Sequence, residues 1–122
     1  MKIQESAENY LEAILELTEK HGSVRSIDVA QHLGVSKPSV SRAMRVLREN
    51  GYVEMDKDGL LSLTEQGAAI AERIYDRHKI LTRWLISLGV DSADAAADAC
   101  KMEHAMSEST FLKMKEHILR EI

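Results

Sequence analysis

A thiol, a carboxylate and an imidazole lie within five consecutive residues near the end of the sequence. They belong to Cys100, Glu103 and His104. In a helix, side chains three and four positions apart share one face, so these three can approach a single point. Thiolate, carboxylate and imidazole are also ligands of late first-row divalent metals. The alternative is a buried thiol, a solvated carboxylate and a core histidine, and the spacing does not decide between the two.

His78 occupies a position where an apolar residue is expected, in another helix that is predicted from about Thr64 to Leu88. Apolar residues recur in this segment every three or four positions, as they do in a helix with one buried face. An imidazole in such a stripe is either a hydrogen-bonded core histidine or a metal ligand. Two further helices are expected over residues 92–104, which contain the cluster, and over residues 107–121.

The last of these helices carries an apolar stripe of Phe111, Met114 and Ile118. A chain of 122 residues buries a smaller fraction of its surface than a larger chain does, so it gains stability by association. We therefore expect the stripe to form the interface of a homodimer.

The first half of the sequence predicts a winged helix-turn-helix. Three helices are followed by two short strands, over about residues 6–21, 27–33, 37–50, 52–55 and 60–63. Ser36 is the expected N-cap of the third helix, and Pro38 suits its first turn, where a missing N–H costs nothing. Asp56-Lys57-Asp58-Gly59 is a typical turn between paired strands.

Charge is unevenly distributed along the chain. The whole chain carries a net charge of −4, whereas residues 23–50 hold five basic and two acidic side chains, a net charge of +3. A basic block on a helix-turn-helix favours DNA binding, although a helical hairpin with a solvated basic face is the alternative. Base contacts are expected from the start of the third helix and phosphate contacts from its later turns. The base-contacting candidates are Ser36, Lys37, Pro38, Ser39, Ser41 and Arg42, and the phosphate-contacting candidates are Arg45 and Arg48.

Composition indicates an ordinary globular chain. Its apolar fraction is 44% and its charged fraction 30%, both typical of globular domains. No stretch reaches the roughly 18 apolar residues of a membrane span, and the N-terminus has no apolar signal-peptide region. The single cysteine excludes an intrachain disulfide and fits the reducing cytosol.

Three motifs together resemble the DtxR/MntR family of metal-dependent repressors. They are Ser36-Lys37-Pro38-Ser39-Val40-Ser41, Tyr75-Asp76-Arg77-His78 and the run from Cys100 to His104. The resemblance implies a mainly α-helical fold, with a winged helix-turn-helix DNA-binding domain over residues 1–64 and an all-helical dimerisation and metal-binding domain over residues 65–122. The chain ends where longer members continue into an SH3-like domain, so we expect that third domain to be absent.

The same resemblance implies a set of metal ligands. Glu12 matches the first-helix carboxylate of the manganese branch, and His78 matches the fourth-helix histidine. Glu103 and His104 match the Glu-His pair that both branches share. Cys100 matches the cysteine of the iron branch, where the manganese branch has glutamate.

Asn9 occupies a ligand position that holds Asp in the manganese branch and Met in the iron branch, and its amide oxygen can coordinate a metal. Thr82 and Ala96 stand where the iron branch has the Glu and His of a second site, so the resemblance allows either one full site or a compact two-metal cluster that shares Glu103. Because thiolate is softer than carboxylate, Cys100 favours Fe(II) over Mn(II). Binding of Co(II), Ni(II) or Zn(II) is expected in vitro.

These features predict a cytoplasmic, homodimeric transcriptional repressor that binds operator DNA of metal-homeostasis genes when Fe(II) or Mn(II) is bound. An enzyme is not expected, because a Cys100 nucleophile with His104 as its base would need an oxyanion hole or a substrate loop, and neither is visible in the sequence. A second alternative is a winged-helix regulator that senses an organic ligand or an oxidant through Cys100.

Overall fold

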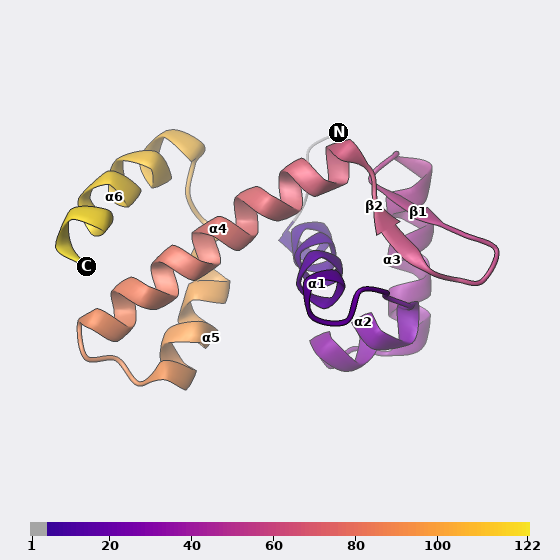
Figure 1. The fold of residues 1–122 in the computed structure, drawn as a ribbon, viewed down its shortest axis with the longest axis horizontal. Coiled ribbons are helices and arrows are strands. Elements are labelled where there is room, and N and C mark those ends of the chain that lie inside the picture. Colours follow the sequence, from indigo (N-terminus) through magenta and orange to yellow (C-terminus); the bar gives the residue numbers. More distant parts are fainter. Residues whose placement is uncertain (1–4) are drawn as a thin grey trace. The chain divides into compact units, whose positions relative to one another are not determined.

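The computed structural model describes residues 5–122, which form six helices and one two-stranded sheet (Figure 1). In chain order the elements are α1 (Glu5–His21), α2 (Ser26–Leu33), α3 (Lys37–Glu49), β1 (Val53–Met55), β2 (Leu61–Leu63), α4 (Glu65–Ser87), α5 (Ser92–Met102) and α6 (Glu108–Glu121). They belong to two compact units, of which the first ends at Glu72 and the second spans residues 73–122. The division falls inside α4, because Ile70 and Ala71 pack into the core of the first unit.

The first unit is a winged helix-turn-helix built around one apolar core. In α3 the Ser36 hydroxyl caps the first turn by accepting a hydrogen bond from the Ser39 N–H at 3.2 Å, as expected for an N-cap serine. One face of α3 is buried in the core, through Val40, Met44 and Leu47. The opposite face is therefore available to solvent.

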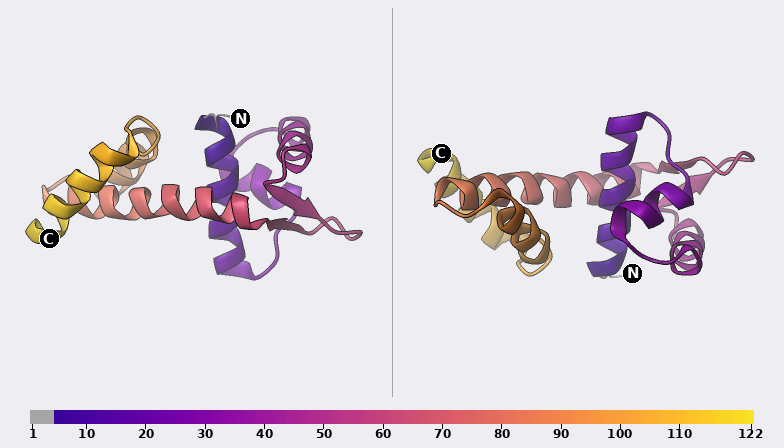
Figure 2. Two further views of the ribbon diagram at one scale, coloured as in Figure 1. Left: turned by 90° about the horizontal axis from the view of Figure 1, so that it is seen from above. Right: turned by 90° about the horizontal axis from the view of Figure 1, so that it is seen from below.

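The wing is the antiparallel hairpin of β1 and β2, in which Val53 pairs with Leu63 and Met55 with Leu61. Its turn projects beyond the helices of the unit in each of the three views (Figures 1 and 2). Two contacts from the segment before α2 support the hairpin. The Leu61 N–H donates to the Val24 carbonyl at 2.7 Å, and the Arg25 guanidinium donates to the carbonyl of Asp58 in the turn.

The second unit packs α5 and α6 against the C-terminal part of α4. Its core consists of buried side chains from all three helices, namely Ile80, Leu81, Ala99, Phe111 and Ile118. Ser107 caps α6 as expected, accepting a hydrogen bond from the Thr110 N–H at 3.2 Å. In contrast, α5 ends at Met102 and not at residue 104. Among the described residues, no helix combines the length and the apolar character needed to cross a membrane.

Gly67 in the first turn of α4 should be intolerant of any side chain. A Cβ atom built there would lie 2.0 Å from the carbonyl oxygen of Tyr52 and 3.0 Å from its carbonyl carbon. Replacing glycine by alanine in a helix ordinarily gains about 1 kcal/mol. We predict the opposite for Gly67→Ala, a loss of about 1–3 kcal/mol in the free energy of unfolding, because the backbone must shift to relieve the overlap.

Urea denaturation followed by circular dichroism measures this loss. Ala69→Ser is the matched control, because Ala69 is exposed in the same helix and a small surface change alters stability by less than about 0.5 kcal/mol. A Gly67→Ala protein as stable as the wild type would mean that α4 and Tyr52 do not approach this closely.

Candidate functional site

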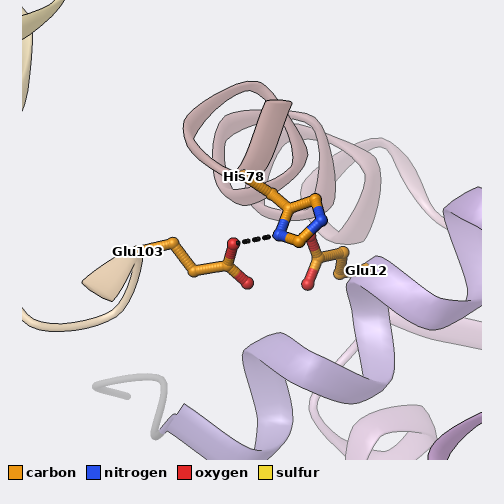
Figure 3. A group of neighbouring side chains, drawn as sticks. All are labelled: Glu12, His78 and Glu103. Atoms are coloured by element: carbon orange, nitrogen blue, oxygen red, sulfur yellow. Dashed lines mark hydrogen bonds and ion pairs between the residues drawn. The ribbon is translucent and has the colours of Figure 1, made fainter. Parts of the chain in front are cut away.

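The Glu103 carboxylate lies between two imidazoles inside the second unit. The residue is 0% exposed. Its Oε2 is 3.0 Å from Nδ1 of His78, with the carboxylate and the ring facing each other in Figure 3. Its Oε1 is 3.3 Å from Nε2 of His104. The structure thus brings together three of the predicted ligands, with the buried carboxylate of Glu103 between the imidazoles of His78 and His104.

Different elements deliver these three side chains. His78 comes from α4 and its side chain is 23% exposed. Glu103 is the C-cap of α5 and keeps an α-helical backbone, because its N–H donates to the Ala99 carbonyl at 2.9 Å. His104 lies in the turn that follows, and its side chain is 2% exposed. The helix expected over residues 92–104 ends at Met102, so Glu103 and His104 lie at its C-cap and in the following turn, and their side chains still meet as expected.

The chemistry of this cluster fits a divalent metal ion. Burying a carboxylate is costly unless charge or hydrogen bonds compensate for the lost water. Here a buried carboxylate faces two imidazole nitrogens, and these are the oxygen and nitrogen donors that bind divalent first-row metals. The donor set alone suits Fe(II), Mn(II) or Zn(II).

The remaining predicted ligands lie on α5 and on α1. Cys100 is half-buried in α5, one turn before Glu103. Glu12, which Figure 3 also labels, is a residue of α1 in the first unit and is 6% exposed. Asn9 is half-buried one turn earlier in the same helix. Burial of Glu12 sets it apart from an ordinary solvated glutamate on a surface helix.

Arg77 is a participant that sequence reasoning did not identify. It is 4% exposed, although arginine is among the residue types that are seldom buried without a partner. Its Nη1 donates hydrogen bonds to the carbonyl oxygens of Glu103, at 3.0 Å, and Met106, at 2.9 Å. Its Nη2 donates to Oε2 of Glu108 at 2.8 Å. The only signal in the sequence was its place beside His78, and periodicity gave no reason to bury a charged residue there.

The residues predicted to contact DNA lie on the solvent side of α3. Seven of the eight are exposed and Ser39 is half-buried, the exposed ones being Ser36, Lys37, Pro38, Ser41, Arg42, Arg45 and Arg48. The Ser36 and Ser39 hydroxyls are hydrogen-bonded to each other at 2.8 Å, and an Arg42 Nη2 lies 3.5 Å from the latter. Arg45 and Arg48 line an open groove that β1 also borders.

The expected dimer stripe on α6 is placed differently. Phe111 and Ile118 are 2% and 1% exposed and belong to the core of their own unit, while Met114 is half-buried. This corrects the expectation for Phe111 and Ile118, because side chains packed against Ile80 and Leu81 cannot also cover a partner subunit. The large apolar side chains that α6 does expose are Leu112 and Leu119, and Ile122, directly after the helix, is exposed as well.

Two family models together match nearly the whole chain. The model described as iron-dependent repressor, N-terminal DNA-binding domain, matches residues 2–61. The model described as iron-dependent repressor, metal-binding and dimerisation domain, matches residues 64–120. The chain belongs to the DtxR/MntR family of metal-dependent repressors.

Curated relatives of this family member come from both the MntR and the iron-dependent groups. The transcriptional regulator MntR of Escherichia coli O6:H1 is 36% identical over 107 residues, which are 88% of this chain and 69% of that protein. The iron-dependent repressor IdeR of Mycobacterium bovis is 31% identical over 108 residues, which are 88% of this chain and 47% of that protein. These relatives are transcriptional regulators and not enzymes.

A solved manganese-dependent transcriptional repressor in complex with manganese has the same fold. Its TM-score is 0.83 at 28% identity, and the match covers 92% of this chain and 52% of that one. The chain thus spans about half the length of that repressor. Relatives named for iron and for manganese both match this chain.

His78→Leu should destabilise the metal-free protein. If His78 only filled a position in the apolar stripe and its contact with Glu103 contributed nothing, leucine would be neutral or stabilising. The structure predicts a loss of about 1–3 kcal/mol in the free energy of unfolding, because the buried Glu103 carboxylate loses one of its two imidazole neighbours.

Denaturation in excess chelator measures the effect, with His117→Leu on the exposed face of α6 as the matched control. If His78→Leu unfolds at the wild-type denaturant concentration or above it, the hydrogen bond to Glu103 contributes no stability.

Proposed function

We propose that this protein is a cytoplasmic, homodimeric transcriptional repressor that binds operator DNA of metal-homeostasis genes when it carries a divalent metal. The observation that carries the proposal is the fully buried Glu103 carboxylate between His78 and His104. It is supported by a first unit that exposes a basic recognition helix, and by the membership of the chain in a family of metal-dependent repressors.

The proposed metal ligands are the six side chains that the family resemblance selects, namely Asn9, Glu12, His78, Cys100, Glu103 and His104. When bound, the divalent cation supplies a concentrated positive charge that matches the carboxylates and accepts lone pairs from imidazole and thiolate. The burial of Glu12 supports its inclusion, because a buried carboxylate needs hydrogen bonds, an ion pair or a metal.

If proposed ligands of both units bind the same metal ion, metal binding would be coupled directly to DNA binding. Glu12 and Asn9 belong to the winged-helix unit, whereas the other four ligands belong to the second unit. Their joint binding would limit the relative freedom of the two units in each subunit. A dimeric reader needs its recognition helices about 34 Å apart to enter successive major grooves. Shifting a 1:99 mixture of spacings to 99:1 requires a differential affinity of about 5.5 kcal/mol, which several ligands shared between the units can supply.

We place the dimer surface on the exposed apolar side chains of the second unit. These are Ile86, Leu88, Leu112, Leu119 and Ile122, each 38% to 63% exposed. A group of large apolar side chains at the surface indicates an interaction site when the residues are contiguous. They take the place of Phe111 and Ile118, which the core of the unit already uses.

Arg42 is proposed to read bases, and Arg48 to bind phosphates. Arg42→Ala should therefore weaken binding to a selected high-affinity duplex by about 1–3 kcal/mol and relax the preference at one or two base pairs. Arg48→Ala should weaken binding to selected and random duplexes alike and reduce the salt slope by about one unit. Fluorescence anisotropy on both duplexes at several salt concentrations separates the two effects. Identical losses for the two variants on both duplexes would contradict this division of roles.

Cys100 is proposed to favour Fe(II) over Mn(II), because a thiolate is a softer ligand than a carboxylate. The test is anaerobic DNA binding against buffered free Fe(II) or Mn(II), using a duplex that the metal-loaded protein selects from a random pool. Wild-type DNA affinity must rise with metal for the proposed function to hold.

In the same assay Cys100→Glu should narrow the gap between the Fe(II) and Mn(II) concentrations that half-activate DNA binding. Cys100→Ala is the matched control that removes the thiolate without adding a carboxylate. An unchanged iron-to-manganese ratio in Cys100→Glu would show that Cys100 does not set the preference, and the protein would then be a manganese sensor.

A further inference from the structure

Two consecutive residues of α4 hold the same residue at the end of α5. His78 Nδ1 is 3.0 Å from the side-chain Oε2 of Glu103, and Arg77 Nη1 is 3.0 Å from its main-chain oxygen. Side chains of one helix, α4, therefore contact both the main-chain oxygen and the carboxylate of a single proposed ligand. The sequence neighbour of a metal ligand thus contacts the site without being able to bind a cation itself.

The contacts of Arg77 extend through the turn that carries His104. Its guanidinium also donates to the Met106 carbonyl at 2.9 Å and to the Glu108 carboxylate at 2.8 Å. It lies over the Phe111 ring, 5.0 Å from the ring centroid. The turn between Glu103 and Glu108 is therefore bonded at its start, in its middle and at its end to one rigid, planar group.

This arrangement has a physical reason at the end of a helix. The last carbonyl groups of an α-helix lack intrahelical partners, and a cation near them also interacts favourably with the helix dipole. From a position that is 4% exposed, Arg77 satisfies the carbonyl of Glu103, which is the C-cap of α5, and also the carbonyl of Met106 in the turn before α6. Where α5 ends at Met102, the Arg77 side chain from α4 therefore supplies a hydrogen-bond donor to the carbonyl of the next residue, Glu103.

We propose that Arg77 is a positioning residue for the metal ligands. By fixing the turn from Glu103 to Met106, it keeps the Glu103 carboxylate between His78 and His104 before any metal binds, so that binding pays less to order its ligands. The expected effect on metal affinity rests on the proposed function, whereas the positioning itself rests on the contacts of Arg77 described above. Lysine cannot replace it fully, because a single ammonium group lacks the planar fork that reaches two carbonyls and a carboxylate together.

The consequence for metal binding can be given a size. Residues that orient metal ligands typically alter metal affinity by about 10–100-fold when they are replaced. We expect Arg77→Met to weaken Mn(II) binding by an amount in that range and Arg77→Lys to lie between Arg77→Met and the wild type. The intermediate rank of lysine distinguishes a positional role from one that depends on charge alone.

Lys115→Met is the matched control. Lys115 Nζ bonds Oδ2 of Asp76 at 2.8 Å, so it also joins α6 to α4, but through residues outside the turn from Glu103 to Met106. Any change in metal affinity or hydrogen exchange that the two variants share therefore reflects a general loss of stability. The difference between them reports the contacts that Arg77 makes with the turn.

The experiment uses the full chain in two states. In the metal-free protein, hydrogen–deuterium exchange of the amides of residues 103–107 should be faster in Arg77→Met than in the wild type and unchanged in Lys115→Met. In titrations with Mn(II) alone, Arg77→Met should bind about 10–100-fold more weakly and Lys115→Met within about twofold of the wild type. If Arg77→Met does not fold, Arg77→Lys carries the same comparison.

Wild-type exchange and wild-type Mn(II) affinity in Arg77→Met would overturn the inference. So would equal losses of affinity in Arg77→Met and Lys115→Met, because Arg77 would then act only through general stability. Failure of the wild type to bind Mn(II), Fe(II) or Co(II) would refute the proposed function instead, and the exchange of the metal-free protein would still decide whether Arg77 holds the turn.

Discussion

Removing a carboxylate from water is costly unless its charge is matched, and Glu103 is 0% exposed. The second unit is organised around that requirement. α4 supplies one imidazole and the guanidinium that holds the adjoining backbone, and the turn after α5 supplies the second imidazole. α6 begins with Glu108, whose carboxylate receives the other side of the Arg77 guanidinium. Three helices are thus joined by polar contacts at one end of a core that is otherwise apolar.

On the proposed function, such a cluster would make the second unit responsive to a cation. A buried cluster of carboxylates, imidazoles and a guanidinium is stable only when each group keeps its partners, so removing or adding one charge affects the other groups. A divalent ion bound by Glu103 and its histidines would compete for the lone pairs that now take part in the His78–Glu103 hydrogen bond and in the contact between His104 and Glu103. The first unit contributes a different property, an exposed recognition helix whose hydroxyl and basic side chains already face solvent. The family to which the chain belongs combines these two properties in one chain.

Local patterns predicted the elements of this fold, because the signals involved are local. Ser36 before Pro38, and the Asp56-Lys57-Asp58-Gly59 turn, lie where the structure has the start of α3 and the end of the wing. The periodicity of α6 marked Phe111 and Ile118 as one apolar face, but periodicity does not say what covers such a face. We expected a partner subunit, whereas the core of the same unit covers both residues. At the end of α5 the Glu103 carbonyl accepts a hydrogen bond from Arg77, 26 residues earlier in the chain, and no neighbouring residue signals that contact.

The central claim is that the buried Glu103 carboxylate is a metal ligand together with its flanking histidines. Anomalous diffraction from crystals of the Mn(II)-loaded protein, collected on both sides of the manganese absorption edge, tests it most directly. The account predicts an anomalous peak within coordination distance of the Glu103 carboxylate and of at least one of the His78 and His104 rings. A manganese peak elsewhere, with none within coordination distance of the Glu103 carboxylate, would contradict it.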